Sequence, residues 1–201
     1  HWFGLYLALY GDGDVKLELY DVWDNRQLDA LKSSFGRLSE AWAKDASIGP
    51  VPRERLASML AVDSFEALYE KFNANYTIDG DGSLAGYPSS AYDGVISFHV
   101  MEHIGRSFIE NSINDMYRML KPGGYCIHQI GIDDHLAHYD NKVSKKNYLQ
   151  HSLSNRKYLF ENVVQYHNVL QGADYQNFFD DAGFEVVELS REKCDVSGLR
   201  I

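Results

Sequence analysis

Residues 92–103 read YDGVISFHVMEH, and this stretch decides the fold. Its first part, residues 92–98, is a short apolar run that is typical of a buried strand. The pentapeptide from His99 to His103 matches the H-x-x-E-H pattern of inverted zinc peptidases, in which two imidazoles and a carboxylate project from one helix. Because a strand directly precedes the pentapeptide, we expect His99 at the carboxyl end of that strand and His103 in the turn beyond it. This context disfavours the zinc site.

Strand-like and helical patterns alternate on both sides of this stretch. Such alternation predicts an α/β fold with a doubly wound, mostly parallel sheet in three layers. Ser64 is expected to cap a helix, and the run KPGG after residue 120 is expected to end another. The expected helices are residues 1–10, most of 25–72, and 106–120; the expected strands are residues 15–22, 75–78, 92–98, 125–132 and 183–193.

The composition points to one domain over residues 1–201. The chain is 45% hydrophobic, which provides enough apolar side chains for a sizeable core. Its 19 basic and 29 acidic residues give a net charge of −10, which opposes binding to nucleic acid or anionic membranes and favours a small-molecule partner. Neither a signal peptide, a membrane span nor a disulfide framework is evident, so we expect a cytoplasmic protein.

Three short motifs resemble those of one enzyme family. Tyr92 and Asp93 form an aromatic-acid pair that opens a strand, Glu102 and His103 follow it, and RMLKPGG at residues 118–124 leads into the next strand. In this combination the chain resembles the class I S-adenosylmethionine-dependent methyltransferases. The resemblance implies a Rossmann-like fold and methyl transfer from S-adenosylmethionine to an oxygen or nitrogen of a small-molecule acceptor.

The resemblance also assigns residues to the cofactor. Asp21, at the end of a strand, matches the acid that holds the ribose hydroxyls, because a carboxylate there accepts two hydrogen bonds. Asp81 matches the acid that contacts the adenine amino group, with Asp79 as a rival, and Gly82 lets the backbone come close. The remaining residues at the expected cofactor cleft are Ser97, Phe98 and His99.

The segment after residue 132 is expected to meet the acceptor. It places Asp133, Asp134, His135 and His138 close together. An imidazole titrates near neutrality, so His135 or His138 is a candidate catalytic base for a hydroxyl or amine. A metal site formed by these four residues and a polar cover with solvated charges are the alternatives, and we assign no metal. For His103 a structural role at the start of a helix is favoured.

In the resembled family a first strand and a glycine-rich loop precede the first helix, and a seventh strand follows the sixth. Neither feature is found in residues 1–201, so we expect a chain truncated at its N-terminus and possibly at its C-terminus. The alternative to an active methyltransferase is therefore a non-catalytic cofactor-binding module or an inactive fragment. A zinc peptidase built on HVMEH comes a distant third.

Overall fold

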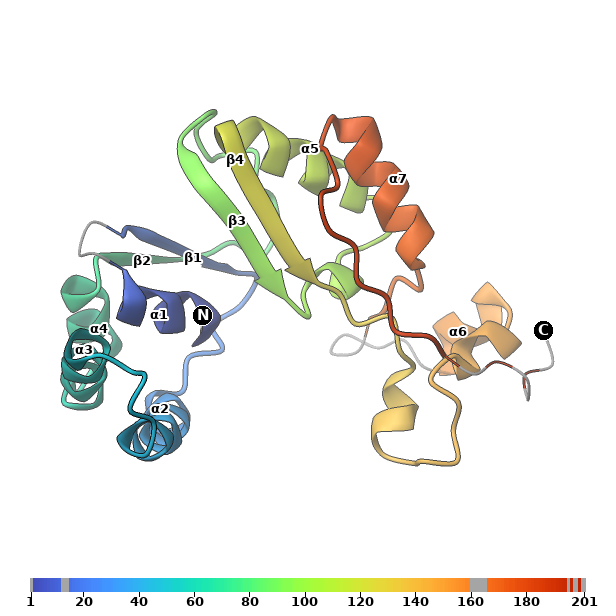
Figure 1. Ribbon diagram of the computed structural model, residues 1–201. Helices are drawn as coiled ribbons and strands as arrows, with labels where there is room; N and C mark the ends of the chain where they lie inside the picture. The colour runs from blue at the N-terminus through green and yellow to red at the C-terminus, as the bar shows by residue number, and fades with distance from the viewer. Residues whose placement is uncertain (1, 12–14, 160–165, 195, 197–198, 200–201) are drawn as a thin grey trace. The chain divides into compact units, whose positions relative to one another are not determined.

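The computed structural model describes residues 2–11, 15–159, 166–194, 196 and 199 (Figure 1). Contacts along the backbone divide the chain into two compact units, His1–Gly82 and Ser83–Ile201. Each unit has its own parallel sheet and its own core, which confirms the α/β class. A single domain over residues 1–201 and a three-layer, doubly wound sheet stay predictions.

The first unit pairs two parallel strands and adds four helices. Leu17 lies opposite Ala74 and Asp21 opposite Ile78, so both strands end at the same edge. The elements in chain order are α1 (Trp2–Tyr10), β1 (Leu17–Asp21), α2 (Leu28–Ala43), α3 (Pro50–Leu60), α4 (Phe65–Lys71) and β2 (Ala74–Ile78).

Local sequence explains where these helices begin. Pro50 is the first residue of α3, where its missing N–H costs nothing. Ser64 caps α4, because its hydroxyl accepts a hydrogen bond from the backbone N–H of Ala67 at 3.1 Å, as expected. The helices bury a common apolar core, whose fully buried members are Leu5, Leu9, Phe35, Leu56 and Leu68.

The second unit contains the stretch that opened the sequence analysis. Residues Tyr92–Phe98 form β3 with the predicted bounds, and β4 (Leu120–Gln129) pairs with it in parallel. Between them lie a 3-10 turn, η1 (Met101–His103), and α5 (Ile109–Met119). The elements after β4 are η2 (His135–His138), η3 (Asn147–Gln150), α6 (Leu153–Leu159) and α7 (Gly172–Ala182).

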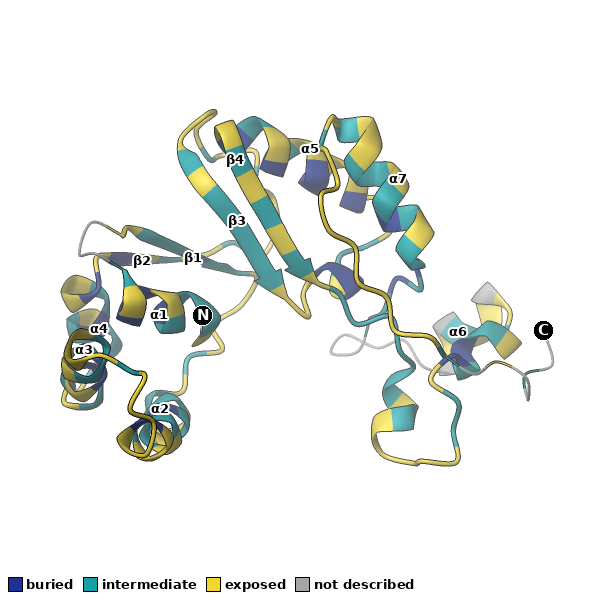
Figure 2. Cartoon of the chain, in the orientation of Figure 1, coloured by how far each residue is buried: buried dark blue, intermediate teal, exposed yellow. Residues whose placement is uncertain are grey.

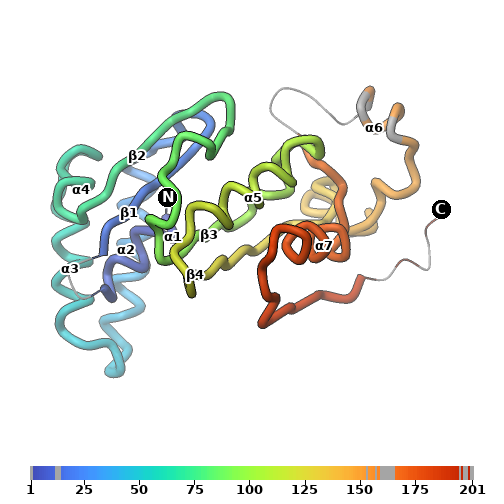
Figure 3. Tube along the Cα trace, turned by 90° about the horizontal axis from the view of Figure 1, so that it is seen from above, coloured from blue at the N-terminus to red at the C-terminus, as the bar shows by residue number. Residues whose placement is uncertain are grey.

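One face of the β3–β4 sheet is covered by α5 and α7, which lie side by side (Figures 1 and 3). His128 of β4 stacks on Phe179 of α7, with ring centroids 5.4 Å apart. Ile109 and Ile113 of α5 are fully buried in the core of this unit. Along β4 half-buried and exposed positions alternate from Gly124 to Gln129, as Figure 2 shows, so the strand packs against other elements on one side only.

The expected last strand does not form. Residues 183–193 have no regular secondary structure, although their sequence alternates like a strand. Val187 is 88% exposed, and no ladder joins the segment to β3 or β4 among the described residues. A strand requires a neighbour to satisfy its backbone hydrogen bonds, and an alternating pattern alone does not supply one.

Arg118 of the RMLKPGG motif anchors the loop that precedes β3. Its guanidinium donates to the carbonyl oxygens of Tyr87 at 2.7 Å and Leu84 at 3.1 Å, and to the Ser89 hydroxyl at 3.1 Å. Asp115, one helical turn away, pairs with it at 3.1 Å. The arginine of this motif therefore has a structural role.

The described helices were compared with the requirements for a membrane span. Among the residues that the structure describes, none of them combines the length and the hydropathy that crossing a bilayer requires.

Candidate functional site

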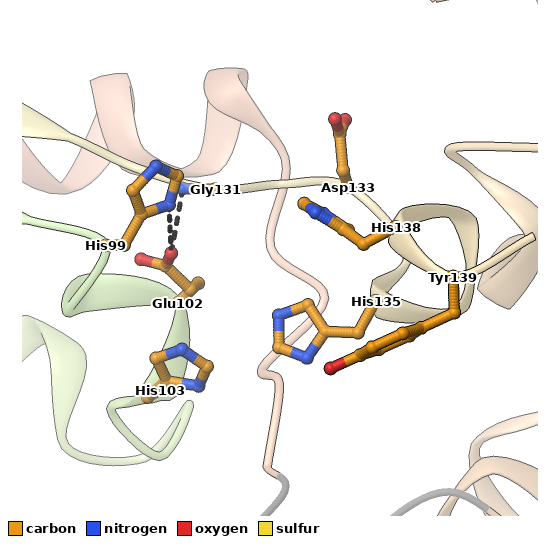
Figure 4. A pocket seen from close by; sticks show the side chains of 8 residues that line it. All are labelled: His99, Glu102, His103, Gly131, Asp133, His135, His138 and Tyr139. Atoms are coloured by element: carbon orange, nitrogen blue, oxygen red, sulfur yellow. Dashed lines mark hydrogen bonds and ion pairs between the residues drawn. The ribbon is translucent and has the colours of Figure 1, made fainter.

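A cavity of about 380 Å³ lies beyond the carboxyl ends of β3 and β4. Ligands of open α/β sheets bind at this edge. Figure 4 shows the side chains that converge on it from the turn after β3 and from the segment after β4. Its lining residues are His99, Glu102, His103, Gly131, Asp133, His135, His138 and Tyr139. We call it the histidine cavity.

The wall nearest β3 is a hydrogen-bonded pair. His99 Nδ1 donates to Glu102 Oε1 at 2.9 Å, and the backbone N–H of Gly131 donates to the same oxygen at 3.0 Å. The Glu102 side chain is only 2% exposed. His99 has a φ of 52°, in the left-handed region that a residue with a β-carbon seldom adopts, and this turns the chain sharply as β3 ends.

The turn that carries Glu102 is held from the segment before α7. His103 Nδ1 donates to the Tyr166 carbonyl at 2.7 Å. The amide of Asn168, itself buried, donates to the carbonyls of Met101 at 2.8 Å and Ile104 at 2.9 Å. These contacts give η1 one conformation and confirm a structural contact for His103.

The opposite wall comes from residues 133–150, which we call the cover segment. Asp134 caps η2, because its carboxylate accepts the Leu136 N–H at 2.9 Å. Lys146 is buried and donates to the Ile132 carbonyl, the Tyr148 hydroxyl at 3.1 Å and Gln171 Oε1 at 3.3 Å. The buried lysine thus fastens the cover segment to the end of β4 and the start of α7.

His135 and His138 both face the cavity from η2 (Figure 4). The His135 ring lies 5.4 Å from those of His103 and His167 and 6.0 Å from that of His138, measured between centroids. Burial lowers the pKa of His135, and the neighbouring imidazoles add to this effect. His135 is therefore neutral near pH 7.

The structure contradicts the zinc peptidase alternative. Residues His99 and His103 do not project from one continuous helix, because β3 ends at Phe98 and only a short 3-10 turn follows. Within the described part of the chain, no three His, Cys, Asp or Glu side chains are arranged to hold a metal ion.

Three of the residues assigned to the cofactor lie at one edge of the first unit. Asp21 ends β1, and its carboxylate accepts hydrogen bonds from the Val22 N–H at 2.9 Å and from Asn25 at 3.4 Å. Asp81 and Gly82 follow β2, the strand paired with β1. Gly82 has a φ of 67°, a conformation that favours glycine. The assignment of these three residues to the cofactor stays a prediction.

The other three lie at the end of β3, with different surroundings. The Ser97 hydroxyl is hydrogen-bonded to His128 Nδ1 at 2.7 Å, on the sheet face that α7 covers. Phe98 is 55% exposed, and its ring meets that of His99 edge to face at 4.5 Å. Of Ser97, Phe98 and His99, it is His99 that lines the histidine cavity, together with His135 and His138.

Sequence reasoning missed part of this site. Glu102 was noted only as half of a motif, and Gly131, Lys146, His167 and Asn168 were not singled out. The three-residue spacing of His99 and Glu102 was a usable signal. His167 donates from Nε2 to the Gly131 carbonyl at 3.0 Å across 36 residues, a contact without a local sequence pattern.

A family model described as a methyltransferase domain matches residues 33–189. This chain belongs to that family. The match spans most of both units, including the histidine cavity, and it confirms the resemblance to class I S-adenosylmethionine-dependent methyltransferases. A comparison with curated proteins finds no match for the methyltransferase.

One similar solved structure is a complex between the Haloferax volcanii methyltransferase activator Trm112 and a protein described as a methyltransferase. It is 16% identical, covers 91% of this chain and 68% of that chain, and has a TM-score of 0.38. The expected partners, a small-molecule acceptor and no nucleic acid, are corrected here: the methyltransferase in that structure is in complex with a protein, the activator Trm112. We withdraw the small-molecule acceptor and the exclusion of nucleic acid.

Proposed function

We propose that the chain transfers a methyl group from S-adenosylmethionine to an oxygen or nitrogen nucleophile. The observation that supports this is the coincidence of a methyltransferase domain with a cavity of imidazoles and carboxylates at the carboxyl ends of β3 and β4. When bound, the cofactor supplies an already activated methyl group and leaves as a neutral thioether. The protein then has to bind, orient and desolvate the two reactants.

The proposal gives each set of residues a task. Asp21 accepts hydrogen bonds from the ribose hydroxyls, and Asp81 with Gly82 receives the adenine. The end of β3, including Ser97, Phe98 and His99, lies beside the cofactor. His135 and His138 contact the acceptor from η2, which accords with their place in the histidine cavity. Asp134 positions both imidazoles indirectly, because its carboxylate caps η2, the turn that carries them.

Transfer of a labelled methyl group tests the proposal. The chain is incubated with S-adenosylmethionine carrying a tritium-labelled methyl group and a heat-inactivated cell extract, which supplies acceptors but no active enzymes. The extract is then separated into small molecules, nucleic acid and protein. We expect label in one fraction, and its identity defines the acceptor class. A folded chain that labels none of them would refute methyl transfer.

Replacing Asp21 with alanine should weaken S-adenosylmethionine binding by about 5- to 150-fold, which corresponds to about 1–3 kcal/mol for a hydrogen-bonding partner left unmet. Calorimetry on the folded variant measures the change. Asp24→Ala is the matched control, because Asp24 lies in the same loop but is paired with Arg26 at 2.7 Å. Equal affinity in the Asp21 variant and the parent would remove Asp21 from the site.

A further inference from the structure

The pair formed by His99 and Glu102 has an arrangement that contact with the cofactor does not explain. His99 Nδ1 lies 2.9 Å from Glu102 Oε1, and because a carboxylate oxygen only accepts, this contact assigns the ring proton to Nδ1. In the neutral ring, Nε2 then offers its lone pair. Among the hydrogen bonds of the described residues, none engages His99 Nε2, and the ring lines the histidine cavity. The pair therefore presents a hydrogen-bond acceptor to whatever fills the cavity.

One oxygen of the Glu102 carboxylate has two hydrogen-bond donors, whereas the other, Oε2, is buried without a partner among the described residues. The partnered oxygen, Oε1, accepts the Gly131 N–H as well as the imidazole, and the Glu102 side chain is 2% exposed. The Glu102 carbonyl accepts the Asn168 N–H at 2.9 Å. A β-carbon at Gly131 would lie 2.6 Å from both Glu102 Oε1 and His99 Nδ1, so a glycine is needed where the strand end approaches the pair.

We propose that His99 is the catalytic base of methyl transfer and that Glu102 is its positioning residue, an inference that rests on the proposed function. The lone pair of the acceptor oxygen or nitrogen forms the new bond to the methyl carbon. The carbon–sulfur bond breaks, and its electron pair stays on sulfur. The proton of the acceptor moves to His99 Nε2, and the carboxylate of Glu102 balances the charge of the imidazolium. The site therefore selects acceptors with a hydroxyl or with a neutral amine that carries an N–H.

The other titratable groups around the cavity are less suited to this task. The Nδ1 of His103 donates to a carbonyl, and His135 faces other imidazoles. Asp133 is paired with Lys145 at 3.2 Å. Of the imidazoles in the cavity, His99 is the one with a hydrogen-bonded carboxylate partner. The groups that face it are Glu102 and His103 from η1 and Asp133, His135, His138 and Tyr139 from the cover segment.

Nitrogen-15 NMR of the histidine rings, which reports which ring nitrogen carries the proton, tests the pair without any acceptor. In the free protein we expect the neutral His99 ring to carry its proton on Nδ1. Glu102→Gln keeps an oxygen for the Gly131 N–H but removes the charge that favours a proton on Nδ1, so the share of rings protonated on Nδ1 should fall. A proton on Nε2 in the parent, or an unchanged tautomer in the variant, would overturn the assignment.

Turnover of the product found by methyl labelling gives the second readout. His99→Gln should lower the rate about 100-fold or more and abolish the fall in rate at acid pH. Glu102→Gln should lower the rate by a smaller factor, because the imidazole remains but is no longer oriented by a carboxylate. Gly131→Ala forces His99 and Glu102 apart but keeps the imidazole, so it should lower the turnover rate about tenfold or more.

His103→Gln is the control, because it removes an imidazole from the same cavity while its amide can still donate to the Tyr166 carbonyl, and it should leave the acid fall in place. If His99→Gln keeps near-parental turnover between about pH 5 and 9, the base assignment is wrong and methyl transfer stands. If the parent chain labels nothing, the proposed function itself fails, and the role of His99 fails with it.

Discussion

Replacing Asn168 with alanine should lower the free energy of unfolding by roughly 3–5 kcal/mol, a loss at the upper end for single substitutions. The Asn168 amide donates to the carbonyls of Met101 and Ile104 and contacts the Tyr175 hydroxyl at 3.0 Å, and its oxygen accepts the Leu170 N–H at 3.1 Å. Asn168 is 3% exposed, so water cannot replace these bonds. Each buried group left without a partner costs about 1–3 kcal/mol.

Urea unfolding followed by circular dichroism measures this loss. Asn75→Ala is the matched control, because Asn75 is exposed and its amide makes one hydrogen bond, to Glu18 at 3.1 Å. We expect that control to change stability by less than about 0.5 kcal/mol. If both variants behave alike, the buried network around η1 does not hold the site together.

Acidification should destabilise the chain by about 3 kcal/mol through His128 alone. Burial lowers the pKa of His128 from 6.5 to about 4. The unfolded state therefore takes up a proton below pH 6.5, whereas the folded state resists until about pH 4. Stability is full above the higher value, falls as the pH drops through this window, and levels off below it.

Denaturant titrations at several pH values across this window measure the effect. The double variant His128→Phe, Ser97→Ala keeps an aromatic ring against Phe179 and leaves no hydroxyl without its acceptor. It should lose less stability on acidification than the parent. An identical pH dependence in both proteins would show that His128 is not buried in its neutral form.

Local patterns predicted the elements whose signals are complete within a few residues. The strand Tyr92–Phe98 was predicted with its observed bounds, because an apolar run ends there and the next residues turn. Ser64 was predicted as a cap because capping needs only the residues of one turn. The segment 183–193 shows the opposite case. Its apolar and polar residues alternate as in a strand, but a strand forms only beside a neighbouring strand, which the local sequence does not reveal.

In the candidate site, too, the residues with a local sequence signal were predicted and those without one were not. His135 and His138 were identified from their spacing and their place after a strand, and both line the cavity, although their roles in catalysis stay predictions. Asn168 and His167 could not be foreseen, since they reach the site across more than 30 residues. Their contacts with the site arise from tertiary packing, which no periodic pattern in the sequence predicts.

Isothermal titration calorimetry with S-adenosylmethionine, and with its demethylated product S-adenosylhomocysteine, tests the central claim most directly. A methyltransferase binds both, because the adenosine portion that Asp21, Asp81 and Gly82 are proposed to hold is common to the two. We expect each ligand to bind at one site and to compete with the other. A chain that is folded by circular dichroism and binds neither would contradict the claim.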